Sequence, residues 1–118
     1  HKKSLLRFST GLRNAAVYHS LQMSEKGFYN HINPHNKKMR DPMTRIRTFG
    51  IESNYYAENI NKEFALDYKE GKTFDRDEGG LYYTLQQKKY VPLLTYIELA
   101  KRIVQGWIDS KPHRENML

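Results

Sequence analysis

The sequence of 118 residues contains no cysteine. This absence excludes disulfide bonds, thiolate nucleophiles and cysteine-ligated zinc, and it leaves the cellular compartment undecided. The chain also lacks any apolar run close to the roughly 20 residues that span a bilayer, so we expect no transmembrane segment. Acidic residues are in the minority, with 13 Asp and Glu against 20 Lys and Arg, for a net charge of +7. Such a charge attracts anions without distinguishing phosphates, acidic glycans and nucleic acid.

Hydrophobic residues make up 38% of the chain and aromatic residues 13%. This content is too high for a disordered chain, and the length suits one domain with a single core. Apolar residues recur at steps of three and four over residues 5–26, which predicts a helix that ends at Gly27. His19 falls on the apolar face of that helix, so we interpret it as a hydrogen-bonded core histidine.

Thr95 and Glu98 have the spacing of a capping box, in which both side chains satisfy free N–H groups at the start of a helix. Apolar residues then recur at steps of three and four, which predicts a helix from about residue 96 to residue 109. Tyr96 and Trp107 fall on the apolar face of this helix, and we expect both in the core.

Shorter elements are predicted elsewhere in the chain. Met43 begins a short helical pattern that ends at Gly50, and a further short helix is indicated after Ser110. The segment "LYYTL" is rich in strand-forming residues and follows a turn-rich stretch. We therefore predict a β-hairpin that turns near Gly79 and Gly80.

Histidine and carboxylate side chains are the remaining candidates for chemistry, since no complete phosphate loop, calcium loop or serine-hydrolase elbow is present. His31 lies just past the first predicted helix, Glu58 lies in "AENI", and His113 lies in "WIDSKPHRENML". Imidazole nitrogens and carboxylate oxygens are normal zinc ligands, and these groups exchange protons near neutral pH. Because the three pieces are far apart in sequence, only the fold decides whether they meet.

Four segments in this order carry a family resemblance: "LRNAAVYHSLQMSEKGFYNH", "DPMTRIRTFGI", "AENI" and "AKRIVQGWIDSKPHRENML". Together they resemble a bacterial member of the CAP superfamily (cysteine-rich secretory proteins, antigen 5 and pathogenesis-related 1 proteins), also called SCP-like extracellular domains. The resemblance implies an α+β fold. The expected architecture is an α/β/α sandwich, with a small antiparallel sheet between helical layers.

The resemblance also implies a surface cleft, for which the candidate lining residues are His31, Arg45, Glu58 and His113. From their ligand chemistry alone, His31 and Glu58 would be the residues that hold zinc or another divalent metal. Arg45 is expected to pair with Glu58 or its neighbours, the alternative being a solvated helix cation. Glu58 has a second reading, in which it accepts main-chain hydrogen bonds and fixes its own loop. His113 either lines the cleft or caps the turn beside it. Structural roles are implied for His19, Asn59, Trp107 and Asn116.

The chain departs from the family pattern at two positions of the cleft. The eukaryotic branch uses two histidines and two glutamates, whereas this chain has Ser110 at the place of the second glutamate and lacks the strand of the second histidine. We therefore expect one domain over residues 1–118, incomplete at its C-terminus, with a hairpin insertion around residues 62–91. An open sheet edge would make a dimer or strand exchange possible.

Three classes of function are compatible with these residues. The first is a secreted or cell-envelope binding module for an unidentified lipid, glycan, peptide or protein ligand, from which any signal peptide has been removed before His1. The second is a metal-dependent hydrolase that uses His31 and Glu58. The third is a nucleic-acid-binding domain, prompted by the charge, but no nucleic-acid motif accompanies the basic residues and no specific nucleic acid is expected. Whether any catalysis occurs is left open.

Overall fold

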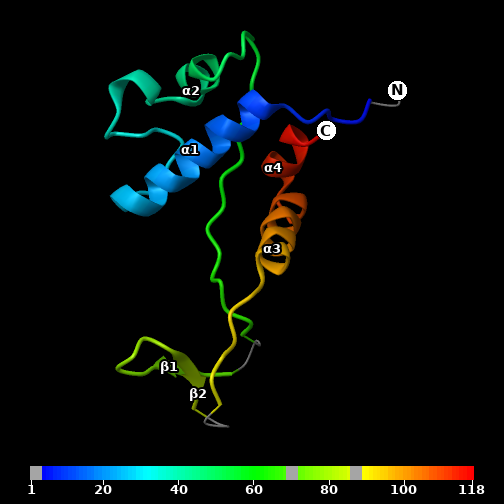
Figure 1. The fold of residues 1–118 in the computed structure, drawn as a ribbon. Helices are drawn as coiled ribbons and strands as arrows, with labels where there is room; N and C mark the ends of the chain where they lie inside the picture. The colour runs from blue at the N-terminus through cyan, green and yellow to red at the C-terminus, as the bar shows by residue number, and fades with distance from the viewer. Residues whose placement is uncertain (1–3, 69–71, 86–88) are drawn as a thin grey trace. The chain divides into compact units, whose positions relative to one another are not determined.

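The computed structural model describes residues 4–68, 72–85 and 89–118. Within it the chain forms two compact units, one comprising His1–Ile60 with Lys111–Leu118 and the other comprising Asn61–Ser110. The first unit contains α1 (Thr10–Lys26), η1 (Lys37–Met39), α2 (Pro42–Thr48) and α4 (Lys111–Asn116), and the second contains β1 (Phe74–Arg76), β2 (Tyr82–Thr84) and α3 (Tyr96–Asp109) (Figure 1). Helices and a small antiparallel sheet confirm the expected α+β class.

Helix α1 begins later than its apolar pattern predicts. Ser9 has extended backbone angles, and its hydroxyl accepts a hydrogen bond from the N–H of Leu12 at 3.3 Å, which makes Ser9 the N-cap. The expected start near residue 5 is therefore wrong, because a cap residue cannot itself continue the helix. The predicted end at Gly27 is confirmed, since this glycine has a φ of 68° and donates its N–H to the carbonyl of Met23.

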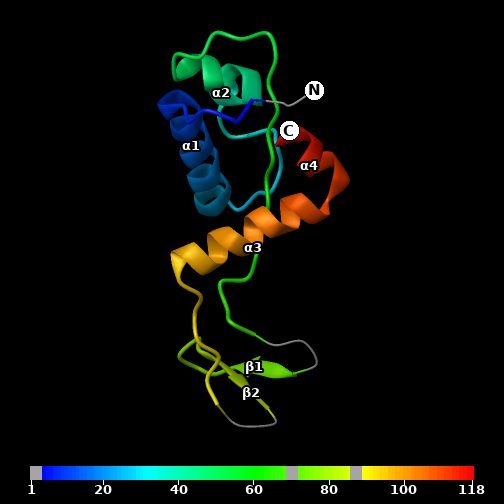
Figure 2. The ribbon, with the colours of Figure 1, turned by 90° about the vertical axis from the view of Figure 1, so that its right-hand side faces the viewer.

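Helix α2 has a reciprocal cap at its first turn. The Asp41 carboxylate accepts from the N–H of Thr44 at 3.0 Å, and the Thr44 hydroxyl accepts from the N–H of Asp41 at 3.3 Å. The chain leaves the helix through Gly50, whose φ of 83° suits glycine. The short helix predicted in this region is confirmed, and it packs against α1 in both ribbon views (Figures 1 and 2).

Half of the core of the first unit is polar. Among the described residues of this unit, the buried apolar side chains are Ala15, Pro42 and Ile46, whereas His19, Asn33 and Arg45 are buried polar side chains. Burial of a polar group costs free energy unless the group finds a partner. The hydrogen bonds of these three residues therefore shape the loops around them.

The second unit contains the predicted hairpin. Strands β1 and β2 pair antiparallel, with Phe74 opposite Thr84 and Arg76 opposite Tyr82. The turn between them includes Gly80, whose φ of 85° explains the glycine at this place. This confirms the hairpin that the sequence predicts around Gly79 and Gly80.

Helix α3 spans the predicted residues, and its capping box is confirmed. Thr95 accepts from the N–H of Glu98 at 3.2 Å, and Glu98 accepts from the N–H of Thr95 at 2.8 Å. Trp107 is partly buried, but Tyr96 is 93% exposed, so its predicted place in the core is wrong. Tyr96 is the first residue of the helix, and helical side chains tilt toward the N-terminus, so its ring extends beyond the helix end. The short helix predicted after Ser110 is confirmed as α4.

Candidate functional site

The loop after α1 brings His31 to Glu58. Nδ1 of His31 lies 2.7 Å from Oε1 of Glu58, although 27 positions separate the two residues in the sequence. The loop is held by an Asn30 side chain that accepts from the N–H of Ile32 at 2.9 Å. The carbonyl of His31 accepts from Nη2 of Arg45 at 2.8 Å, so both the main chain and the ring of this histidine are fixed.

Arg45 lies at the centre of this cluster and is 1% exposed. Its Nη2 atom donates to both carboxylate oxygens of Glu58, at 2.9 and 2.8 Å. Its Nη1 atom donates to the carbonyl of Arg40 at 2.9 Å and lies 3.4 Å from the carbonyl of Met39. A buried guanidinium needs such a set of acceptors, because an unpaired buried charge is strongly destabilising.

The charges around His31 determine what its ring offers. Glu58 only accepts hydrogen bonds when ionised, so the proton of a neutral His31 lies on Nδ1 and the lone pair lies on Nε2. The His31 side chain is 46% exposed and that of Glu58 is 21% exposed. The opposite charges of Arg45 and Glu58 offset each other at 2.8 Å. The cluster therefore presents an oriented imidazole with a pair of opposite charges behind it.

The donor set fits a catalytic metal poorly. His31 and Glu58 supply two donors, whereas a catalytic zinc ion usually takes three protein ligands. The Arg45 cation contacts both oxygens of Glu58, and a divalent cation at that carboxylate would have to compete with it. Within the described ranges of the chain, no group of three or more His, Cys, Asp or Glu side chains has metal-binding geometry.

Asn59 connects the segment after Glu58 to α4. Its Nδ2 donates to the main-chain carbonyl of His113 at 3.0 Å, and its Oδ1 accepts from Nδ2 of Asn116 at 2.8 Å. The extended segment passes α4 at this point (Figure 2). The described link between His113 and the "AENI" segment thus uses a backbone atom. Assignment of the His113 ring to a cleft stays a prediction.

His19 forms a hydrogen bond to the loop that carries His31. Its ring is buried, and Nε2 lies 2.7 Å from the carbonyl of Asn30, the residue before His31. The carbonyl is an acceptor, so Nε2 carries the proton, and the buried Nδ1 has no hydrogen-bond partner among the described residues. Burial lowers the pKa of His19 below its ordinary value, and the bond to the Asn30 carbonyl opposes this shift in part.

Two asparagines of the loop were missed by sequence reasoning. Asn33 is fully buried; its amide donates to Gln22 at 3.3 Å and accepts from the N–H of His35 at 2.9 Å. Asn36 accepts from the N–H of Lys38 and donates to the hydroxyl of Tyr18 at 2.8 Å. The stretch "INPHNKKMRDP" reads as an irregular basic loop, but Asn side chains that bond the backbone two residues ahead are a known turn device. That device is the pattern that would have identified them.

A cavity of about 340 Å³ lies between α1, α2 and the segment after α2. Glu58 is on its wall, among mostly apolar neighbours. Its other lining residues are Leu12, Ala15, Ala16, Pro42, Ile46, Ile51, Ser53, Tyr55, Tyr56, Ala57 and Asn59. Glu58 therefore connects the polar cluster with an apolar space.

The family model for the cysteine-rich secretory protein family (CAP) matches residues 1–118. No curated protein and no solved structure matches the chain. The family is typically secreted or extracellular, and its domains are generally binding modules. No helix in the described part of the chain is long and apolar enough to cross a membrane. The match covers the whole sequence and confirms the resemblance of the four segments to the CAP superfamily, so this chain, although it has no cysteine, belongs to the CAP family.

Proposed function

We propose that this chain is a secreted or cell-envelope binding domain whose ligand contacts His31 beside Glu58. The observation that carries the proposal is an exposed imidazole whose ring is oriented by a carboxylate, which is in turn held by the buried Arg45. A side chain that must keep one geometry when a ligand binds is typically oriented by hydrogen bonds to residues behind it.

The chemistry of the site favours a ligand that donates a hydrogen bond. A neutral His31 offers Nε2 as an acceptor, and the paired charges behind it add no net charge. Hydroxyl groups of glycans and lipid headgroups, and N–H groups of peptides, all meet this need. The apolar cavity wall that includes Glu58 would accept an adjoining apolar part of the same ligand.

Binding is better supported than metal-dependent hydrolysis at these residues. Hydrolysis through a metal requires the Glu58 carboxylate as a ligand, and Arg45 already contacts both of its oxygens. We therefore treat the metal as the weaker alternative. In this alternative, His31 and Glu58 would hold zinc or another divalent cation, which would activate a water molecule.

The test compares three proteins: wild type, His31→Ala and the matched control His35→Ala. Each is applied to arrays of phospholipids, sterols, glycans and extracellular peptides. We expect one ligand class that wild type and His35→Ala retain and that His31→Ala binds about tenfold more weakly, the loss expected for one hydrogen bond to the ring. A ligand bound equally by all three proteins would remove His31 from the site. Zinc titration of the same proteins tests the alternative, which gains support only if wild type binds zinc and His31→Ala does not.

A further inference from the structure

The second unit contains a cavity of its own, with a volume of about 240 Å³. Three aromatic side chains, Tyr68, Phe74 and Tyr90, lie on its wall together with Pro92. The rings support each other, since the centroids of Tyr68 and Phe74 are 6.2 Å apart and Tyr90 packs edge-on against Tyr83 at 6.4 Å. The cavity therefore has aromatic walls that are already in place.

Arg102 fixes one side of this cavity. Its guanidinium lies 5.6 Å from the centroid of the Tyr68 ring and donates to the carbonyl of Leu66 at 3.1 Å. It also lies 3.4 Å from the carboxylate of Asp67, which is a lining residue of the cavity. The negative charge of Asp67 is thus offset by Arg102.

Two lysines, Lys72 and Lys89, line the same cavity. No salt bridge to either is found within the described ranges of the chain. With Asp67 offset by Arg102, the two ammonium groups leave the wall positively charged. A cavity with apolar faces and local positive charge is complementary to a ligand that has a ring and an anionic group.

We propose that this cavity binds one anionic sugar residue of an acidic glycan. The C–H face of a sugar ring would lie against the electron-rich faces of the aromatic side chains, while a carboxylate or sulfate pairs with Lys72 and Lys89. The volume is below the range of about 300–1,000 Å³ of sites for drug-sized ligands, so it suits a single ring. This site shares no residue with the His31 cluster, and either proposal can fail alone.

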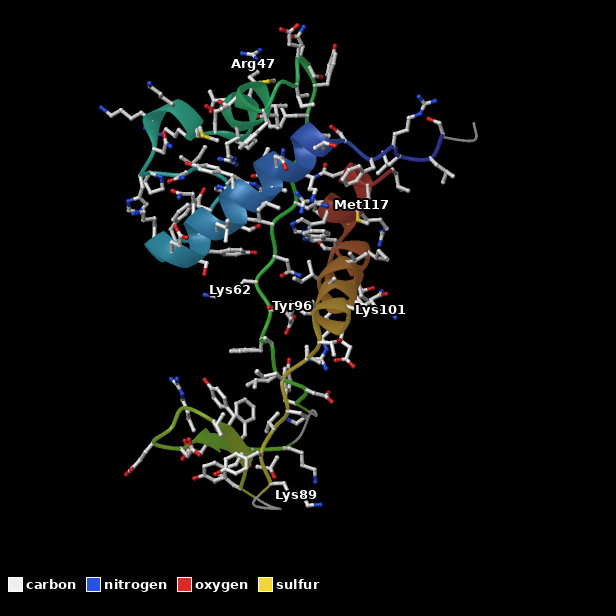
Figure 3. All side chains as sticks on the ribbon, in the orientation of Figure 1. Arg47, Lys62, Lys89, Tyr96, Lys101 and Met117 are labelled. Atoms are coloured by element: carbon white, nitrogen blue, oxygen red, sulfur yellow. The ribbon has the colours of Figure 1, made fainter. Side chains whose placement is uncertain are left out.

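The first experiment measures the affinity of the full chain for a uronic-acid disaccharide and for a neutral disaccharide of equal size, by calorimetry. Lys72→Ala/Lys89→Ala is compared with Lys62→Ala/Lys101→Ala, which removes the same charge from exposed lysines of the same unit (Figure 3). We expect the acidic sugar to bind about tenfold more weakly to the first variant and less than about twofold more weakly to the second. The neutral sugar should bind wild type about tenfold more weakly than the acidic one.

A second pair of variants tests the aromatic wall. Tyr90→Leu keeps an apolar side chain but removes a ring face, and Tyr96→Leu makes the same change at a tyrosine that is not a lining residue. We expect Tyr90→Leu to bind the acidic sugar about fivefold more weakly, equivalent to about 1 kcal/mol, and Tyr96→Leu to bind it with unchanged affinity. Circular dichroism confirms that each variant is folded.

The proposal is overturned by any of three results. The first is no binding of the acidic sugar to wild type at millimolar concentration. The second is an equal loss in the two lysine pairs, which would show attraction to net charge only. The third is tighter binding of an acidic peptide than of the acidic sugar, which would assign the cavity to a different class of partner.

Discussion

At the scale of single residues, Arg45 joins the core of the first unit to the candidate site. It is one of the most buried side chains, yet its Nη2 atom reaches the loop of His31 and the carboxylate of Glu58. In a unit with few buried hydrophobic groups, this network replaces much of the packing that would otherwise hold the loops. Stability and site geometry therefore depend on the same residue.

The Arg45–Glu58 pair is expected to show strong energetic coupling. Glu58→Gln leaves the buried guanidinium of Arg45 without its counter-charge, so we expect this single substitution to lower the free energy of unfolding by about 3 kcal/mol. Arg45→Met removes the guanidinium itself. The double variant should lose less than the sum of the two single losses, with a coupling of about 1–3 kcal/mol. Urea unfolding of the four proteins measures this. Additivity within about 0.5 kcal/mol would contradict the coupling.

We expect His19 to make the free energy of unfolding depend on pH. Burial lowers its folded-state pKa, so between that value and the unfolded value of about 6.5 the unfolded chain binds more protons than the folded chain. The contribution of His19 to stability is therefore complete above pH 6.5 and is lost as the pH falls toward the folded pKa. The loss has a slope of at most about 1.4 kcal/mol per pH unit.

Urea unfolding across this pH range checks the prediction for His19. His19→Gln keeps an amide donor for the Asn30 carbonyl but does not titrate, so we expect its slope to be smaller than that of wild type. His35→Ala, at an exposed position, should keep the wild-type slope. Identical slopes in all three proteins would assign the pH dependence to other groups.

At the scale of elements, α1 packs closely at Gly11 against the segment that follows α2. A Cβ atom on Gly11 would lie 2.8 Å from Cδ1 of Ile51 and 2.8 Å from the carbonyl oxygen of Phe49. The second neighbour is backbone and cannot move without disturbing the end of α2. Gly11 is therefore required by packing, although glycine weakens a helix.

Two glycine substitutions in helices are expected to have opposite effects. Gly11→Ala should destabilise the protein by about 1–3 kcal/mol, because overpacking outweighs the gain in helix propensity. A Cβ atom at Gly106 in α3 would meet only the side-chain amide of Asn61, at 3.0 Å, and that amide would give up only a long 3.5 Å hydrogen bond to the carbonyl of Ile103 if it moved. We therefore expect Gly106→Ala to stabilise the protein by about 0.5 kcal/mol. Thermal unfolding of both variants gives the signs. A higher thermal stability of Gly11→Ala would contradict the close packing at Gly11.

At the scale of the whole molecule, the net charge of +7 is the property most easily measured. Charge alone supports weak binding to any polyanion, with an affinity that falls steeply as salt rises. It does not support sequence recognition, because no nucleic-acid motif accompanies the basic residues.

Binding to duplex DNA should therefore be no tighter than binding to an acidic polysaccharide of matched charge density. Both affinities are expected to fall by at least about tenfold between 50 and 200 mM salt, as for other sequence-independent contacts. Fluorescence anisotropy with labelled polymers measures each. A DNA affinity that exceeds the polysaccharide affinity and persists at 200 mM salt would restore the nucleic-acid hypothesis.

The family and the local elements of this protein could be read from the sequence by itself. The ends of α1 at Gly27 and of α2 at Gly50, the capping box of α3 and the hairpin turn all depend on residues within a few positions of one another. Caps and turns of this kind can be predicted from sequence because the interactions that stabilise them are between residues close together in the chain. The exposure of Tyr96 was misjudged because periodicity identifies a face but not what covers it.

The family resemblance groups His31, Arg45 and Glu58 in one cleft, but the tertiary structure alone decided which of their atoms meet. Nothing in the spacing of His31, Arg45 and Glu58 states that one guanidinium contacts both the carbonyl of the first and the carboxylate of the last. The link from Asn59 to α4 spans more than 50 residues. The physical reason is that a buried polar group takes whatever acceptor the packed chain brings within about 3 Å, and that choice is made only when the chain has folded.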